Sequence, residues 1–408
     1  MTALAQPTRS AGRRELIIAL LSVLMSAASS GPNYVLPDYL LAIQAHYGLQ
    51  VSQLGFIPGG ESLAIGIGCL LTGFFLRRGH GRAILIAAAV CVIGDMASLV
   101  ARDFVSIAAV RMITGLAGEG PLYAISYMVI AASLNPDRVL GIAVTAIALA
   151  GAAVLMVEGP LTHALGPAAV LLPFAVVSAM MLVWVLRDKS IVMVKQSIDT
   201  PSEKLEIRGG LDKGALAIIV SIVLLMAVVS ALWAFIGTAA EAAGARPEDI
   251  ARAISVGIVF GLAGSIVPAV IGNRFGRILP VTLCGLGLIL GCVLMVSGGS
   301  FMRVAVASAV VQFSWGMNAV YMLTGLVARD NGGRYTSVGA VAQMLGMALG
   351  PPIFGSFISG FGYVNLPFLA AAGALPGLAL FVLGSASWTR VAGWRLFRQF
   401  ARTNNSPT

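Results

Sequence analysis

Long runs of apolar residues alternate along the chain with short breaks that contain charged residues, Gly or Pro. Each run has about 20 residues, the length that a helix needs to cross a hydrocarbon layer about 30 Å thick. A membrane barrel strand would instead alternate apolar and polar residues over about 10 positions. The pattern therefore predicts membrane-spanning helices. Twelve are expected, near residues 15–37, 52–76, 83–101, 104–131, 139–163, 168–187, 215–240, 250–273, 279–298, 302–328, 335–360 and 364–386.

One long polar segment divides these helices into two sets of six. We therefore predict an all-α membrane protein with 12 transmembrane helices in two pseudo-symmetric six-helix halves. The N-terminal half covers residues 1–187, a cytoplasmic linker covers 188–213, and the C-terminal half covers 214–387. Residues 388–408 contain aromatic side chains interleaved with arginines, a pattern typical of an amphipathic helix that lies on anionic lipid.

The distribution of basic residues predicts the orientation of the chain. Most of them lie on the side of the two termini and the linker, and the other side has four: Arg102, Arg246, Arg252 and Arg303. Because Lys and Arg are in excess in cytoplasmic loops, both termini should be cytoplasmic, in a bacterial inner (plasma) membrane. This asymmetry accounts for the net charge of +9 without a nucleic-acid partner. We expect a monomer that binds a small-molecule substrate and membrane lipids.

Composition and motifs exclude several other classes of protein. Apolar residues make up 58% of the chain and charged residues only 11%, whereas soluble domains are about 25% charged. The four cysteines lie inside apolar runs without metal-ligand spacing, so neither a disulfide framework nor a metal site is expected. The phosphate-binding motif G-x-x-x-x-G-K-[ST] does not occur. We expect no catalytic residues and no cofactor, and a proton gradient as the energy source.

A Gly-Arg pair recurs at corresponding positions of the two predicted halves. Gly81-Arg82 follows the second predicted helix, and Gly276-Arg277 follows the eighth. Repeats of this kind are typical of transporters whose two halves rock around a site near the middle of the membrane.

The residues around both pairs resemble a loop signature of the major facilitator superfamily, G-x-x-x-D-R-x-G-R. The copy at residues 269–277 has Arg274, but Asn273 stands where the family has Asp; in the copy at 74–82, Arg78 stands there. In the family this Asp is thought to meet a helix N-terminus and to hold the halves together. An Arg would be repelled by that positive helix end, so this lock is absent here or is built differently.

Further signatures of the family occur in the fourth, fifth and eleventh predicted helices. They are R-x-x-x-G at residues 111–115, a partial G-x-x-x-G-P with Leu155 before Gly159 and Pro160, and a complete one with Gly346, Gly350 and Pro351. The resemblance implies a fold in which helices 1, 4, 7 and 10 line the cavity. Helices 2, 5, 8 and 11 would form its gates, and the others would stand behind. The signature residues are expected in gating or structural roles.

Five charged side chains lie within predicted helices and away from the helix ends: Glu61, Asp95, Arg111, Glu119 and Glu158. Such groups usually pair, titrate or face the bundle interior, because an unpaired charge in lipid is expensive. Arg111 is expected to pair with Glu61 or Asp95, which lie at a similar depth. Glu61 is expected to face the cavity and to take part in proton coupling, and Asp95 is expected to have a structural role. The alternative is a static buried ion pair.

Glu119 lies between two glycines and two positions before Pro121. This proline removes a backbone donor and predicts a kink. An acid beside freed carbonyls is typical of proton sites in discontinuous transporter helices, so Glu119 is expected to carry the coupled proton. Alternatively, it bonds only to backbone or faces cytoplasmic water. Glu158 is expected to act in gating or proton access, or else to lie at the membrane interface.

The C-terminal half has no ionisable residue deep in a predicted helix, so its cavity wall should be aromatic and rich in amides. The candidates for substrate contact are Arg111, Asn33, Tyr34, Asp38, Tyr123, Trp233, Gln312, Trp315, Asn318 and Gln343. Aromatic residues in such helices more often face lipid or the core, and this alternative stays open for each of them.

The sequence thus favours a proton-coupled secondary active transporter of a small organic solute that works by alternating access. Acids in the first half and an apolar second half indicate efflux by proton antiport of an amphipathic or cationic compound. The alternative is proton symport or exchange of a small organic anion bound by Arg111. A free Arg111 would favour the anion, and an Arg111 bound to Glu61 the first hypothesis. More distant are a lipid-modifying membrane enzyme and a receptor that does not transport.

Overall fold

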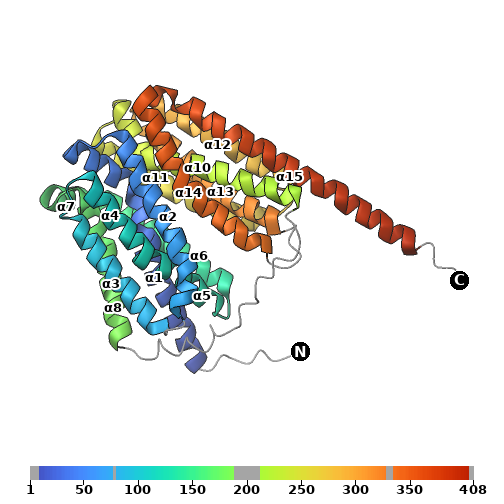
Figure 1. Ribbon diagram of the computed structural model, residues 1–408, viewed down its shortest axis with the longest axis horizontal. Helices are drawn as coiled ribbons and strands as arrows, with labels where there is room; N and C mark the ends of the chain where they lie inside the picture. Colours follow the sequence, from blue (N-terminus) through green and yellow to red (C-terminus); the bar gives the residue numbers. More distant parts are fainter. Residues whose placement is uncertain (1–8, 77–79, 188–211, 328–333, 404–408) are drawn as a thin grey trace.

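The computed structural model describes residues 9–76, 80–187, 212–327 and 334–403. Every regular element in these ranges is helical (Figure 1). Arg78 and nearly all of the predicted linker lie outside the described residues.

The first set of helices occupies the described chain up to residue 187. It comprises α1 (Arg9–Tyr47), α2 (Val51–Leu76), α3 (His80–Ser98), α4 (Phe104–Thr114), η1 (Gly115–Glu119), α5 (Gly120–Ala131), α6 (Pro136–Val157), α7 (Gly159–Leu165), η2 (Pro167–Leu171) and α8 (Leu172–Arg187). The second set comprises α10 (Lys213–Ala242), α11 (Pro247–Ile271), α12 (Ile278–Val296), α13 (Phe301–Val327), α14 (Arg334–Phe361), η4 (Tyr363–Asn365) and α15 (Leu366–Thr403).

The described chain supplies twelve segments long enough to cross a membrane, as predicted. Eleven are sufficiently long and apolar as helices in their own right. The twelfth, residues 104–131, is divided into α4, η1 and α5 because a π-helical turn interrupts it.

Three helix ends differ from their predicted positions. α1 continues past Pro37 to Tyr47, since neighbouring groups in a membrane bundle compensate for the donor that an internal proline lacks. α6 ends early, at Val157, because Pro160 has no N–H to continue the helix. α15 continues to Thr403, through residues that were predicted to form a separate tail.

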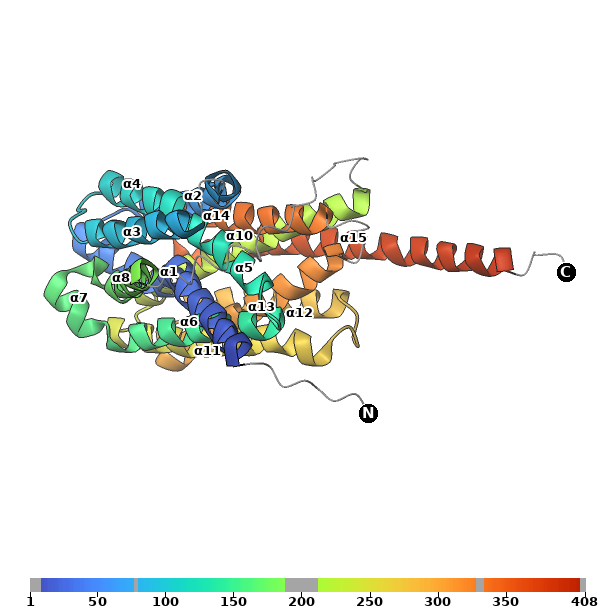
Figure 2. The same cartoon turned by 90° about the horizontal axis from the view of Figure 1, so that it is seen from below.

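Helices from the two sequence halves pack against each other mainly in three pairs: α2 with α14, α6 with α11, and α1 with α10. Figures 1 and 2 both show α2 beside α14. In Figure 1 the two sets of helices converge on the side of α7 and diverge toward the side where α1 begins, while α15 projects beyond the bundle. The halves are therefore splayed at one end and joined at the other.

Hydrogen bonds between the halves lie in the part of the bundle toward the joined end. Ser52 N–H donates to Ser359 Oγ (2.9 Å), Trp233 Nε1–H donates to the Asn33 carbonyl (2.8 Å), and Ser255 Oγ–H donates to the Ala152 carbonyl (3.2 Å). We call these three contacts the seam. The distribution of basic residues predicts that the seam faces the outside of the cell.

Glycines bring α2 and α14 close together beside the seam. A Cβ on Gly55 would collide with the carbonyl of Pro351, and a Cβ on Gly59 would lie 2.7 Å from the Ala348 carbonyl. Small residues are typical of membrane-helix interfaces because they let backbones approach. The joined end is thus held by close packing and single hydrogen bonds.

The seam makes a direct prediction about cross-linking. Cysteines introduced together at Ser52 and Ser359 should form a disulfide under mild oxidation, because the 2.9 Å hydrogen bond between these residues is compatible with the Cα separation of about 4.4–6.8 Å that a disulfide requires. The bond is detected by mass spectrometry of the digested protein, with each single-cysteine variant as a control. Absence of the cross-link would show that the halves are not joined at this end.

Candidate functional site

The start of α4 is fixed by an N-terminal cap. The Asp103 carboxylate accepts hydrogen bonds from the backbone N–H groups of Val105 and Ser106, both at 3.0 Å, and from the Ser106 hydroxyl at 2.8 Å. The bonds from Ser106, first from its backbone and then from its hydroxyl, hold the pKa of Asp103 below its ordinary value. The cap is therefore ionised at neutral pH. It sets the register of the helix that carries Arg111 two turns later.

The expected kink before Pro121 takes the form of a π-helical turn, η1. The Gly120 N–H bonds to the Gly115 carbonyl five residues earlier, and such widened turns are frequent at functional sites. Glycine allows close packing there, because a Cβ on Gly118 would lie 2.7 Å from the sulfur of Cys91 on α3. The turn thus brings Glu119 toward α2 and α3.

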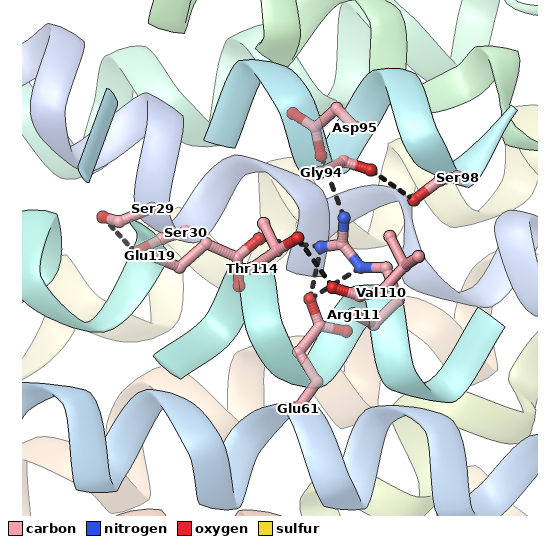
Figure 3. A network of polar contacts seen from close by, with 10 residues as sticks. All are labelled: Ser29, Ser30, Glu61, Gly94, Asp95, Ser98, Val110, Arg111, Thr114 and Glu119. Atoms are coloured by element: carbon pink, nitrogen blue, oxygen red, sulfur yellow. Dashed lines mark hydrogen bonds and ion pairs between the residues drawn. The ribbon is translucent and has the colours of Figure 1, made fainter. Parts of the chain in front are cut away.

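The guanidinium group of Arg111 lies among three carboxyl groups from three different elements (Figure 3). Its Nε–H donates to Glu61 Oε1 on α2 at 2.9 Å, and Nη2 forms a further ion pair with the same oxygen. Nη1 donates to Asp95 Oδ1 on α3 at 2.9 Å, and Nη2 donates to Glu119 Oε1 on η1 at 2.7 Å. We call these four residues the Arg111 network.

The four charged residues of the Arg111 network are all buried. Arg111 and Asp95 are each 1% exposed, Glu119 is 2% exposed and Glu61, the most accessible, is 9% exposed. The structure shows both pairings that the sequence left as alternatives, Arg111 with Glu61 and Arg111 with Asp95. It also places Glu119 in the same network, whereas the sequence indicated a separate site at the kink. Arg111 and Glu119 are eight residues apart, close to two helical turns, and this spacing was the available signal.

The carboxyl groups of Glu61 and Glu119 approach the same nitrogen of Arg111, since Oε1 of each contacts Nη2. Two carboxylate anions held this close would repel each other, whereas a proton on one of them would allow a hydrogen bond between them. This pair is therefore a suitable place for a proton.

A second pair of acids lies where α6 ends. Glu158, the C-terminal cap residue of α6, is 5% exposed and lies within hydrogen-bonding range of Asp38 on α1, while its Oε2 has no hydrogen-bond partner. The sequence indicated a place at the cavity for Asp38 and a separate gating role for Glu158. The structure brings them together because α1 continues as a helix past Pro37. A proton on one of these two carboxyl groups would remove the repulsion between them.

The remaining cavity candidates of α1, α5 and α10 lie in closed contacts. Trp233 is 1% exposed and belongs to the seam through its bond to Asn33, so it does not line an open wall in this structure. Tyr34 packs against Gly151 of α6, where a Cβ would lie 2.5 Å from the Tyr34 Cβ. The Tyr123 hydroxyl donates to that of Tyr127 at 3.3 Å.

The candidates in the second half differ in burial. On α13, Gln312 and Asn318 are buried and Trp315 is half-buried, as is Gln343 on α14. Neither amide atom of Asn318 has a hydrogen-bond partner. The side-chain amide of Asn318 is therefore buried in this structure with neither its donor nor its acceptor hydrogen-bonded.

The signature glycines of α14 lie against α10. A Cβ on Gly346 would be 2.7 Å from the Met226 Cβ, and one on Gly350 would be 2.5 Å from Ser230 Oγ. Pro351 meets Gly55 beside the seam. These residues let the helices pack closely.

The other signature residues lie at helix ends. Gly81 and Arg82 are in the first turn of α3, and the exposed Gly159 and Pro160 begin α7. The turn between α11 and α12 contains Asn273, Arg274, Gly276 and Arg277; there Gly276 has a positive φ of 69° and its N–H bonds to the Asn273 carbonyl at 3.1 Å. Both Arg82 and Arg274 are exposed.

Metal binding finds no support in the described part of the chain. No group of three or more His, Cys, Asp or Glu residues there has an arrangement that suits an ion. The acids of the Arg111 network are instead arranged around a guanidinium.

Comparison with solved structures shows the fold. The nucleoside transporter NupG superposes with a TM-score of 0.73 at 13% identity, covering 90% of this chain and 98% of NupG. The xylose transporter XylE from E. coli, in an inward open conformation, superposes with a TM-score of 0.66 at 16% identity, covering 88% and 95%. At such low identity these likenesses establish architecture alone.

No curated protein matches the sequence. The sequence profile of the Major Facilitator Superfamily, by contrast, matches residues 18–351, which is most of the chain. The prediction of an all-α membrane protein with this fold is confirmed. The chain belongs to the Major Facilitator Superfamily of membrane transporters.

Proposed function

We propose that the chain is a proton-coupled secondary active transporter that exports an amphipathic or cationic organic compound in exchange for protons, by alternating access. The Arg111 network carries this proposal, because three buried carboxyl groups surround one guanidinium in a family of transporters. Glu119 and Glu61 are proposed to hold the coupled proton, and the proton gradient to supply the energy.

Counting charges supports proton binding. With all three carboxyl groups ionised, the network would hold two negative charges in excess. Burying an uncompensated charge costs several kcal/mol per ion, and a proton is the smallest ligand that removes one such charge. A proton shared by Glu61 and Glu119, whose Oε1 atoms both contact Nη2 of Arg111, would remove such a charge. The network is therefore suited to take up a proton from one side and release it to the other.

The state of Arg111 disfavours an organic anion as the substrate. Its Nε, Nη1 and Nη2 groups all donate to carboxyl oxygens, and the residue is 1% exposed. An anion would have to displace one of these acids in order to reach the guanidinium. The alternative of symport or exchange of a small organic acid bound by Arg111 therefore has less support than cation export.

Charge and aromatic character support the substrate class. The described ionisable residues deep in helices, apart from Arg111, are acids of the first half, and they would attract a cation. The second half offers Trp315 and the unpaired amide of Asn318. Nucleosides and xylose, after which the two solved transporters of similar fold are named, are neutral and polar. They serve as competing substrates in the test.

The closed seam suggests the order of steps in a transport cycle. The structure combines a closed seam with two pairs of neighbouring acids, Glu61 with Glu119 and Asp38 with Glu158. In the proposed cycle both pairs are protonated in this state. We propose that protons arriving from the outside favour this state. Their release to the cytoplasm then lets the compound bind, and the loaded protein opens the seam.

Replacing Glu119 by Gln tests the coupling. The amide keeps the size of the side chain but cannot carry a proton, so pH-driven movement of the substrate should fall to the level of protein-free vesicles. The measurement uses proteoliposomes with an imposed pH gradient and four probes: the aromatic cation ethidium, uridine, xylose and the anion benzoate. The wild type should move ethidium.

Glu248→Gln is the matched control, because Glu248 is an exposed acid at the start of α11 with no bond to the network. It should transport like the wild type. If Glu119→Gln retains pH-driven transport, Glu119 is not the coupling residue. If uridine, xylose or benzoate moves instead of ethidium, the substrate class is wrong while the coupling stands.

The Asp38–Glu158 pair gives a second prediction. If it carries its own proton through the cycle, the double variant Asp38→Asn/Glu158→Gln should exchange fewer protons per cation. The ethidium gradient that a given pH gradient sustains would then be smaller than in the wild type. Glu241→Gln, an exposed acid at the end of α10, is the control. An unchanged gradient in the double variant would restrict coupling to the Arg111 network.

A further inference from the structure

Tyr39 of α1 has a hydroxyl group without a hydrogen-bond partner, although the residue is only 2% exposed. Buried polar groups are almost always paired, and each exception calls for an explanation. A phenylalanine would fill the same space without an unpaired hydroxyl. The position of Tyr39 in the bundle indicates what this group does.

The Arg111 network faces Tyr39 from several elements. The charged or titratable groups within electrostatic range are Arg111 on α4, Glu61 on α2, Asp95 on α3 and Tyr47 on α1 itself. α1 also packs on η1, the element that carries Glu119. In this structure the three acids are bonded to Arg111. The Tyr39 hydroxyl lies within electrostatic range of the network and is hydrogen-bonded to none of its members.

The same stretch of α1 holds one side of the joined end. The Asn33 carbonyl accepts the Trp233 indole bond of the seam. One turn later the Pro37 carbonyl lies 2.9 Å from where a Cβ on Gly237 of α10 would be. Tyr39 is two residues further along this helix. A small movement of α1 toward the network would therefore disturb its contacts with α10.

We propose that Tyr39 is a positioning residue that links the protonation state of the Arg111 network to the seam. When the pair of Glu61 and Glu119 loses its shared proton, the two carboxylates repel each other and Glu61 needs a new donor. The Tyr39 hydroxyl then donates to Glu61. This bond draws α1 toward α2, and the α1–α10 contact loosens. The inference rests on the proposed proton coupling and adds the mechanical step to it.

The pairing state of Tyr39 supports this order of events. Hydrogen bonds to charged groups are stronger than those between neutral groups, so the hydroxyl gains most when the network is ionised. In the structure Glu61 and Glu119 both contact Nη2 of Arg111, the seam is closed and the Tyr39 hydroxyl is unpaired. The proposal assigns the shared proton to this closed state, in which Tyr39 has no hydrogen-bond partner.

The test follows the joined end directly and needs no substrate. Spin labels are attached to cysteines at the exposed positions Gln50 and Gly360, which flank the contact of α2 with α14. Distance distributions are measured in the full-length protein at acidic and alkaline pH. In the otherwise unchanged protein, the ratio of open to closed populations should rise on going to alkaline pH by about tenfold, the effect of one hydrogen bond to a charged group.

Tyr39→Phe should abolish this rise. Because it removes an unpaired hydroxyl, it should not lower the thermal unfolding temperature at acidic pH. If Tyr39 had only a structural role, Tyr39→Phe would leave the pH response of the spin-label distances unchanged. Ser178→Ala on α8 is the matched control, since it removes another fully buried hydroxyl without a partner and should respond like the wild type.

Glu119→Gln in the labelled protein separates the two proposals. If it removes the pH response while Tyr39→Phe retains it, the network controls the seam without Tyr39, and the present inference is wrong. If the wild type shows no pH response, the inference is equally wrong, and the coupling is judged by the vesicle experiment alone. Loss of the response in both variants, with Ser178→Ala unaffected, supports the link.

Discussion

The architecture of the first half depends on how a single guanidinium group is accommodated away from water. Arg111 is 1% exposed, and its partners come from α2, α3 and η1. Removing one partner from a buried ion pair typically costs about 3–5 kcal/mol, because an uncompensated charge remains. These elements are therefore bound into one unit. The π-helical turn follows from the same requirement, since it directs Glu119 back toward the arginine.

The contacts between the halves are of a different kind. The seam consists of single hydrogen bonds, each worth about 0.5–1.5 kcal/mol net, beside closely packed glycines and prolines. In lipid no hydrophobic driving force holds helices together, so such packing is firm enough to close one end and weak enough to open it again. A protein with ion pairs inside one half and light contacts between halves is built to move as rigid units.

The sequence predicted the features that the bilayer imposes, and it did not predict those that depend on packing between distant segments. The apolar runs determined the twelve crossings, because the thickness of the bilayer fixes helix length. Arg111 and its neighbours at similar depth, Glu61 and Asp95, were identifiable because a charge in lipid needs a partner. The pairing of Asp38 with Glu158 was not predictable. It depends on α1 continuing past Pro37 and on α6 ending at Val157, and the balance between a kinked and a broken helix at proline is decided by packing.

The same dependence on packing explains why, in the proposed cycle, α1 is the element that connects proton binding with access. Its residues Asp38 and Tyr39 are adjacent, and successive side chains on a helix point about 100° apart. One faces Glu158 and the other the Arg111 network, while Asn33 and Pro37 face α10. A helix with these contacts responds to charge on two sides and transmits any displacement to a third. In the proposed cycle, deprotonation of either acid pair introduces like-charge repulsion beside α1 and so weakens the seam, whichever pair releases its proton first.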